Sequence, residues 1–494
     1  MTGPTEGRAL EPRLSVIIPA FNVEDWIGLT LESILGASEQ SLEVLVVDDG
    51  STDETRRVVE NIATLDARVR LLPNPGKGGA QARNFAIGQA SGEFLAFSDG
   101  DDLVPQRAYE YLLRQADASG NDMVVGNHVT SEPQRLVKRS SNLPLYRQTE
   151  AGLTLVDEPL FLRDRVCWNR IIRRSTWQRL GLEFADSRRS NDIQAMTRAY
   201  CMIPFDVIPE PVYVYRRRVG STSMTSNKLR SDALRDHFTQ EIACSDAVAS
   251  LGNKHLGDRY FAGILEFDVW AHGREVALQE AHEFDEVREL MLELVTRASR
   301  DAVRSLPAHH RLFYTFVGRG DWEAARIIVG RQGRTMADAL DRVDAAGIVR
   351  AAIATDGKTG RAAAWLVRAS YLKAIVDDPN RSDEQIVSLQ RKARALVRLG
   401  LPKSAFEWRD RQILLANSAD AEAIREAARK SEPFGVLYVA RRVRGVLARV
   451  AKADEDRGAP TPQQMLSMAR RVRPRHVRKA GGVAIRVARR RLGR

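Results

Sequence analysis

Three apolar segments near the start of the chain each end abruptly in polar residues, and helical stretches separate them. The segments are LSVIIPAF, LEVLVVDDGS and GEFLAFSDGDD. Short apolar runs rich in β-branched residues predict buried strands, and strands that alternate with helices predict a mostly parallel sheet covered on both faces. Ligands of such sheets bind beyond the carboxyl ends of the strands. We therefore expect an α/β fold in which the polar residues at 19–22, 48–53 and 99–102 share one ligand-binding edge.

The third segment gathers three carboxylates, Asp99, Asp101 and Asp102, within four positions. Close carboxylates raise one another's pKa, so such a cluster needs a cation or a proton to persist. Mg²⁺ and Mn²⁺ prefer carboxylate oxygen and typically bridge one or two protein carboxylates to a substrate phosphate. We therefore predict that these three aspartates are metal ligands and that the cofactor is Mn²⁺ or Mg²⁺.

A glycine-rich stretch, NPGKGGAQARN, lies between the two acidic clusters. Its glycines allow the backbone to approach a ligand closely, and Lys77 and Arg83 carry the positive charge that a diphosphate attracts. The stretch lacks the Lys-Ser/Thr ending of a P-loop, which argues against that motif. Together with the carboxylates, it predicts a nucleotide site in which a metal ion holds the phosphates.

The chain from about Tyr109 to about Lys228 continues with strand-like and helical segments. A strand is predicted in DMVVGNHV, a Trp-containing helix over residues 166–181 and a further helix over residues 191–201. Trp168 and Trp177 are expected to pack in the core, with stacking on a sugar as the alternative. Beyond Leu229 the strand signals fade. Helix-turn-helix pairs rich in Ala, Arg, Leu and Glu then predict a helical region, which resembles a repeat array without a definable period.

Positive charge is concentrated at the end of the chain. The net charge is +11, but residues 434–494 contain 17 Lys/Arg against three Asp/Glu, so residues 1–433 are slightly acidic. Apolar and basic residues alternate at near-helical spacing in FGVLYVARRVRGVLARVAK, which favours a helix lying on an anionic membrane surface; a solvated tail is the alternative. The absence of aromatic residues after Tyr438 argues against a nucleic-acid partner.

The expected location is cytoplasmic, on the inner face of the cell membrane. No apolar run approaches the roughly 18 residues that span a bilayer, so membrane association would be peripheral. The three cysteines show neither disulfide-framework nor zinc-site spacing, which indicates a reducing compartment.

Five motifs in order, SVIIPAFN, VVDDGSTD, GGAQARN, GEFLAFSDGDD and YRRRVGSTS, resemble those of family 2 glycosyltransferases. The resemblance covers residues 13–228. It implies a GT-A fold and an inverting transferase that uses a nucleotide-diphospho-sugar. The predicted organisation is a flexible N-terminus over residues 1–12, a GT-A domain over 13–228, a helical accessory domain over 229–433 and a basic amphipathic tail over 434–494.

The resemblance also assigns roles to individual residues. It implies that Asp99 and Asp101 hold the metal against the diphosphate, with Asp102 close by, and that YRRRVGSTS forms a mobile lid. The family's Glu-Asp pair at a helix start is Asn191-Asp192 here, which makes Asp192 the implied catalytic base; a helix cap is the alternative role. The motifs and the resemblance together give these donor-binding residues: Pro19, Phe21, Asn22, Asp49, Lys77, Arg83, Asp99, Arg216, Arg218 and Ser221.

The implied function is a hexosyl- or N-acetylhexosaminyl-transferase. Its donor is expected to be UDP-linked, and its acceptor a hydroxyl of a bacterial glycopolymer or lipid-linked saccharide, as in the family's wall-teichoic-acid and capsule-polysaccharide transferases. The competing hypothesis is a catalytically inactive GT-A scaffold, or a protein that binds polyanions or membranes. Homo-oligomerisation is left open.

Overall fold

The computed structural model describes residues 12–132, 135–137, 145–187, 190–217, 230–330, 334–356, 360–378 and 381–429. The chain divides into two compact units. The first comprises Met1–Arg331 with Asp338–Leu366, and the second comprises Gln332–Ala337 with Val367–Arg494. The first unit contains the whole sheet and continues past the predicted domain boundary at residue 228.

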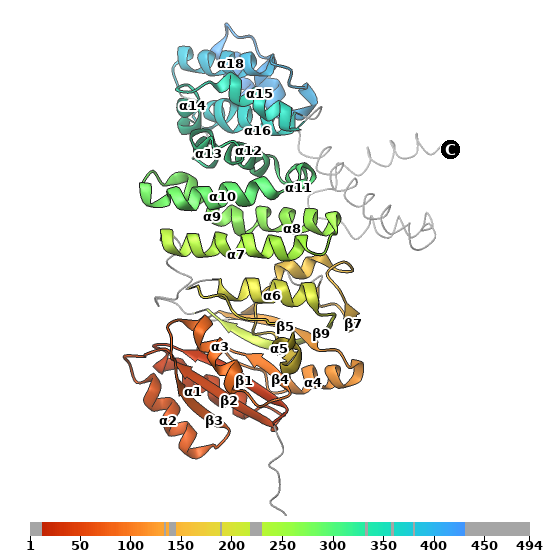
Figure 1. The fold of residues 1–494 in the computed structure, drawn as a ribbon. Helices are drawn as coiled ribbons and strands as arrows, with labels where there is room; N and C mark the ends of the chain where they lie inside the picture. The colour runs from red at the N-terminus through yellow and green to blue at the C-terminus, as the bar shows by residue number, and fades with distance from the viewer. Residues whose placement is uncertain are drawn as a thin grey trace, which may run out of the picture. The chain divides into compact units, whose positions relative to one another are not determined.

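A nine-stranded sheet forms the centre of the first part of the chain, up to residue 217 (Figure 1). The strand order is β3-β2-β1-β4-β8-β5-β9-β7, with β6 paired to β5. The strands are β1 (Leu14–Ala20), β2 (Leu42–Asp48), β3 (Val69–Pro73), β4 (Phe94–Phe97), β5 (Met123–Glu132), β6 (Arg135–Val137), β7 (Glu150–Leu153), β8 (Arg170–Arg173) and β9 (Phe205–Arg216).

The first four strands are parallel, and their register fixes the functional edge of the sheet. β1 lies between β2 and β4, with Ala20 opposite Asp48 and Ile17 opposite Phe97. The chain therefore leaves all three strands at the same edge. This edge is where the sequence predicted the polar residues to meet, because parallel strands end together.

Helices cover both faces of the sheet. The helices of this region are α1 (Glu24–Leu35), α2 (Thr55–Leu65), α3 (Gly79–Gln89), α4 (Ala108–Ser119), α5 (Arg174–Arg179) and α6 (Asn191–Met202), with the 3₁₀ turn η1 (Pro159–Arg163). Apolar side chains of α1 and α4 form a core with alternate residues of β1 and β2, such as Val16 and Val44. Helix α3 packs against the same two strands through Ala82 and Ala86. The predicted α/β class with a mostly parallel sheet and a helical region after it is confirmed.

The helix predicted over residues 166–181 is wrong for most of its length. Arg170–Arg173 is the buried strand β8, which lies antiparallel between β4 and β5, and only Arg174–Arg179 is helical. Ile171 and Ile172 are fully buried on opposite faces of a central strand, and such a run carries no period-2 signal. Trp168 therefore lies in the turn before β8, whereas Trp177 lies in α5.

Helices follow β9, and no described residue after it lies in a strand. They are α7 (Ser231–Ala249), α8 (Lys254–Glu266), α9 (Asp268–Leu278), η2 (His282–Phe284), α10 (Asp285–Arg297), α11 (Arg300–Ser305), α12 (Ala308–Val317), α13 (Trp322–Val329), α14 (Arg334–Leu340), α15 (Ala345–Asp356), α16 (Arg361–Val367), η4 (Arg368–Leu372), α17 (Lys373–Asp377), α18 (Asp383–Val397), η5 (Lys403–Ala405), α19 (Trp408–Leu415) and α20 (Ala421–Arg429). Among the described helices none is both long and apolar enough to cross a bilayer.

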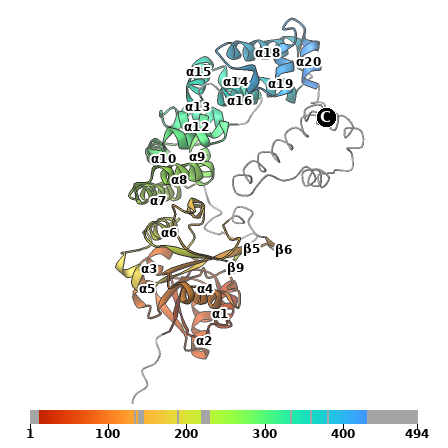
Figure 2. The same cartoon turned by 90° about the vertical axis from the view of Figure 1, so that its right-hand side faces the viewer.

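The helices after β9 form pairs, as the sequence predicted. In the first unit, α7 packs along α6, so the helices after β9 begin directly on the region that contains the sheet (Figure 2). In the second unit, α19 and α20 form the helix pair predicted in residues 402–430, and Gln390 of α18 donates to the carbonyl of Ile413 at 2.7 Å. The basic tail over residues 434–494 lies outside the described residues.

Candidate active site

The loops after β1 and β2 hold each other at the carboxyl edge of the sheet. Asn22 adopts a positive φ of 49°, and its side-chain oxygen accepts the N–H of Thr52 at 2.8 Å. The carboxylate of Asp49 accepts the N–H of Gly78 at 2.8 and 2.9 Å and the amide of Asn74 at 2.6 Å. Asp49 thus orders the loop that carries Lys77 into helix α3.

Arg83 connects the ends of two elements that are far apart in sequence. Its guanidinium donates to Asp99 Oδ1 at 2.7 Å and to Asn191 Oδ1 at 3.2 Å. Its side chain is buried, and Gly79 lies close enough that an added Cβ would come within 3.2 Å of Arg83 Nη1. Arg83 therefore ties the acidic end of β4 to the first turn of α6. The sequence identified Asn191 only as a departure from the family pair, and the structure gives it this partner.

Asp102 is held by protein groups on both carboxylate oxygens. Oδ1 accepts the N–H of Arg216 at 2.6 Å, and Oδ2 accepts the hydroxyl of Tyr213 at 2.9 Å. Burial, then the charges of Asp99 and Asp101, raise the pKa of Asp102 to about 8. Asp99 and Asp101 are partly exposed, whereas Asp102 is 1% exposed. The three aspartates thus have different surroundings, with Asp102 joined to β9.

Among the described residues, no group of three or more His, Cys, Asp or Glu side chains is arranged to hold a metal ion by itself. A protein-only metal cage is therefore not a feature of the described part of this edge. Mg²⁺ characteristically uses one or two carboxylates together with substrate phosphate oxygens and water. Asp99 and Asp101 match that smaller donor set.

Tyr213 and Trp168 belong to this edge although the motifs did not identify them as site residues. The Tyr213 hydroxyl accepts the N–H of Asp99 at 2.9 Å while it donates to Asp102. Trp168 stacks on Tyr213 with ring centroids 4.4 Å apart and on Tyr215 at 6.1 Å. The two tyrosines, at i and i+2 of one strand, share a face, and that alternation in VYVYR is the signal that sequence reasoning could have used.

Asp192 lies in the first turn of α6, next to Asn191, and is partly buried. Burial raises the pKa of its carboxyl; Arg83 opposes this effect and Asp99 adds to it. The N-cap residue of α6 is Ser190, so Asp192 is not the helix cap that was its alternative interpretation. The charges of Arg83 and Asp99 both act on Asp192. Asp192 therefore lies at the same edge of the sheet as the acidic cluster.

The remaining predicted donor residues have different positions. Phe21 is 54% exposed beyond β1, Lys77 is exposed in the loop before α3, and Pro19 lies beside Gly79. The guanidinium of Arg216 lies over the ring of Trp26, with Cζ 4.8 Å from its centroid. Arg218 and Ser221 lie outside the described residues.

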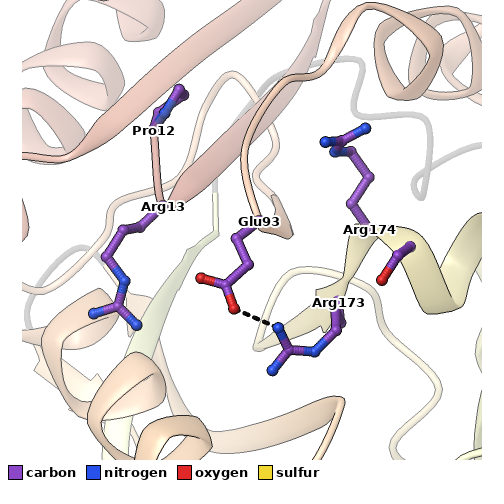
Figure 3. A pocket seen from close by; sticks show the side chains of 6 residues that line it. Pro12, Arg13, Glu93, Arg173 and Arg174 are labelled. Atoms are coloured by element: carbon purple, nitrogen blue, oxygen red, sulfur yellow. Dashed lines mark hydrogen bonds and ion pairs between the residues drawn. The ribbon is translucent and has the colours of Figure 1, made fainter. Parts of the chain in front are cut away.

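A cavity of about 370 Å³ lies at the other edge of the sheet, where β1 and β4 begin (Figure 3). It is lined by Pro12, Arg13, Glu93, Arg173, Arg174 and Ser175. Its arginines are engaged with protein groups: Arg173 pairs with Glu93, Arg13 pairs with Asp117, and Arg174 donates to the carbonyl of Gly92. The cavity is therefore separate from the acidic edge, and each of its three arginines has a protein partner.

Comparison with known proteins identifies the class. A model of the family "Glycosyl transferase family 2" matches residues 15–181. The glycosyltransferase GlyG of Streptococcus pneumoniae serotype 4 is 30% identical over 227 residues, covering 43% of this chain and 73% of GlyG. The succinoglycan biosynthesis protein ExoO of Rhizobium meliloti is 32% identical over 251 residues, covering 48% of this chain and 68% of ExoO.

Solved structures of glycosyltransferases have a similar fold. S. aureus TarS 1–349, solved in complex with UDP-GlcNAc, matches with a TM-score of 0.55 at 20% identity, covering 64% of this chain and 90% of that chain. The fold is that of GT-A glycosyltransferases such as TarS. The chain belongs to glycosyltransferase family 2, and the prediction of this family from the motifs is confirmed.

Proposed function

We propose that this glycosyltransferase is metal-dependent and inverting, takes its sugar from a UDP-linked donor and uses Asp192 as catalytic base. One observation carries the proposal. Arg83 donates both to Asp99 at the end of β4 and to Asn191 at the start of α6. The proposed metal-binding segment and the proposed base segment are thereby held within reach of one guanidinium, which is the proximity that a single displacement reaction needs.

The residues at the edge fit Mn²⁺ or Mg²⁺ shared with a diphosphate. Asp99 and Asp101 offer the hard oxygen donors that these ions prefer, and both are partly exposed. Burial, then the charges of Asp99 and Asp101, raises the pKa of Asp102, and a cation beside these carboxylates would relieve the repulsion among them. When bound, the ion would neutralise the charge that develops on the departing nucleoside diphosphate.

The chain's own groups then have separate tasks. Asp192 accepts the proton of an acceptor hydroxyl lined up opposite the leaving group, so the anomeric centre inverts. Arg83 keeps Asp99 and the start of α6 in register. Asp49 orders the loop that presents Lys77 to the phosphates.

We propose as acceptor a hydroxyl of a bacterial cell-surface glycopolymer or of a lipid-linked saccharide. One relative, the GalNAc(5)-diNAcBac-PP-undecaprenol beta-1,3-glucosyltransferase of Campylobacter jejuni, is named for a lipid-linked acceptor and is 34% identical over 141 residues, covering 28% of this chain and 45% of that protein. The surplus of positive charge in residues 434–494 supports contact with an anionic membrane face.

Calorimetric titration tests the donor and metal assignments. UDP and UDP-sugars are expected to bind in the presence of Mn²⁺, and affinity should fall about tenfold or more without Mn²⁺ or in Asp101→Ala. Asp117→Ala is the matched control, because Asp117 is an exposed aspartate of α4, away from the acidic edge, that pairs with Arg13. Lack of binding by UDP and by every UDP-sugar, with and without Mn²⁺, would overturn the proposal.

Tyr213→Phe tests whether β9 sets the geometry of the acidic edge. The change removes the hydroxyl that accepts the Asp99 N–H and donates to Asp102. We expect the Mn²⁺-dependent affinity for UDP to fall about tenfold, since partners of metal ligands typically contribute this much, and the free energy of unfolding to fall by about 1–2 kcal/mol. Tyr215→Phe, on the same face of β9, is the control. Unchanged affinity in Tyr213→Phe would show that the hydroxyl does not position Asp99.

A further inference from the structure

Helix α7 presents two buried polar side chains to the transferase region, the part of the chain from residue 12 to residue 217 that contains the sheet. His237 and Glu241 are one helical turn apart and therefore share a face. The ring nitrogen Nδ1 of His237 lies 3.0 Å from the hydroxyl of Ser190, and Glu241 forms a paired hydrogen bond with Arg165 at 2.8 and 2.6 Å. Both contacts reach residues close to α6, and Figure 1 shows α6 and α7 side by side. Helix α7, the first helix after the sheet, thus packs against α6, which carries the proposed catalytic base.

Ser190 has an unusual backbone. Its φ is 54° and its ψ is 25°, in the left-handed region. In the part of the chain that the structure describes, Asn22 and Ser190 are the two non-glycine residues with positive φ, and both lie at the proposed site. This conformation costs on the order of 1 kcal/mol for a non-glycine residue and persists only where its surroundings impose it.

The Ser190 hydroxyl does not cap α6, although Ser190 is the N-cap residue. Serine at an N-cap position usually accepts a backbone N–H from the first turn of its helix. Ser190 occupies the N-cap of α6 but makes no such bond, and its hydroxyl is instead bonded to His237. The start of α6 is therefore bonded to a residue of α7, 47 positions further along the chain, as well as to Arg83 through Asn191.

His237 is suited to hold this geometry. Its side chain is 6% exposed, and its Nε2 is buried without a hydrogen-bond partner. Burial, with His272 beside it, lowers the pKa of His237 to about 3, so the ring is neutral at pH 7. A neutral imidazole can either accept from or donate to a hydroxyl. Burying Nε2 without a hydrogen-bond partner costs free energy that an apolar side chain of similar size would not cost. Packing alone therefore does not explain a histidine at this position.

We propose that His237 is a positioning residue for the transfer reaction: through Ser190 it fixes the first turn of α6 and hence the direction of the Asp192 carboxylate. This inference rests on the proposed role of Asp192 as catalytic base. It makes α7 a working part of the transferase, although α7 lies outside the segment that carries the family motifs. Asp192 is two residues from Ser190, so a change in the Ser190 backbone rotates the turn that carries it.

The test compares Ser190→Ala, His237→Leu and His237→Gln in the full chain, with Ser250→Ala as control because Ser250 caps the far end of α7. The substrate is the UDP-sugar that binds best in calorimetry, and release of UDP by hydrolysis measures turnover without an acceptor. Ser190→Ala and His237→Leu are expected to lower kcat about tenfold to hundredfold at unchanged UDP affinity, the range that a misplacement of about 1 Å produces. His237→Gln, which keeps a hydrogen-bonding group, should restore kcat to within about threefold of wild type.

Epistasis distinguishes positioning from general damage. In an Asp192→Asn background, Ser190→Ala should cause no further loss, because the group that it positions is already absent. Ser190→Ala also keeps the test valid if His237→Leu fails to fold. Wild-type kcat in both Ser190→Ala and His237→Leu would overturn the inference. If Asp192→Asn is inactive in the same assay, the proposed function still stands. If Asp192→Asn itself keeps wild-type turnover, the proposed function fails instead.

Discussion

Asp192→Asn is expected to lower turnover of the donor sugar by about 10³-fold while UDP affinity stays within about threefold of wild type. Asparagine keeps the size of the side chain and one acceptor oxygen but cannot act as a base. The loss should therefore appear in kcat rather than in nucleotide binding. UDP release under saturating donor measures it.

The pH profile provides a second readout of the same assignment. Burial raises the pKa of Asp192, with Arg83 opposing and Asp99 adding to the rise. Because the ionised carboxylate is the active form, a raised pKa moves the acid limb of kcat/KM to higher pH than an ordinary aspartate would give, and the rate falls as pH drops through that pKa. The residual activity of Asp192→Asn should lose this limb.

Asp186→Asn is the matched control for Asp192→Asn. Asp186 lies six residues before Asp192, is exposed, and accepts a hydrogen bond from Gln81 of α3 at 2.9 Å. Its replacement should leave kcat and the pH profile unchanged. If Asp192→Asn retained more than about a tenth of wild-type turnover, another group would have to serve as base.

The functional edge could be predicted from sequence because its signals are local. Apolar runs ending at Ala20, Asp48 and Phe97 indicate strands, and parallel strands bring their carboxyl ends together without any knowledge of side-chain contacts. The register of β1 with β2 and β4 confirms this step. The same locality explains why α6 was predicted closely, since it begins at Asn191.

The sequence could not predict what each residue of the edge contacts, because those contacts join distant segments. The segment Arg170–Arg173 was misassigned as helix because a short strand buried on both faces has no alternation. The difference between Asp102 and its two neighbours depends on Tyr213 and Arg216, more than 100 positions away. Likewise, the partner of Ser190 lies on α7, in a region without family motifs.

Glu241→Ala is expected to lower the free energy of unfolding by about 3–5 kcal/mol, since it leaves the buried guanidinium of Arg165 without its main counter-charge. Arg165 and Glu241 are 5% and 0% exposed, and Tyr260 also donates to Glu241 at 2.7 Å. Chemical denaturation followed by circular dichroism measures the loss. Lys254→Ala, which breaks an exposed pair with Asp258, is the control and should cost less than about 1 kcal/mol.

The same ion pair gives the unfolding free energy a defined pH dependence. Burial opposes ionisation of Glu241, but Arg165 and Tyr260 outweigh it and lower its pKa to about 2. A carboxyl whose pKa is lower in the folded state contributes stability above its unfolded pKa, near 4.5, and loses that contribution as pH falls toward about 2. The contribution at neutral pH is about 3 kcal/mol, and it should be missing from the acid unfolding curve of Glu241→Ala.

Replacing both partners separates charge pairing from packing. In Arg165→Met/Glu241→Leu neither charge of this pair is left buried without its partner, so most of the lost stability should return. A loss below about 1 kcal/mol in Glu241→Ala would mean that water reaches Arg165 and that α7 is only loosely joined to the transferase region. The expected large loss would instead mean that a fragment ending at residue 228 lacks a helix whose ion pair stabilises the fold, since Glu241 lies on α7. The family motifs would then be insufficient to define a stable transferase, because its folding would require the helix that also holds Ser190.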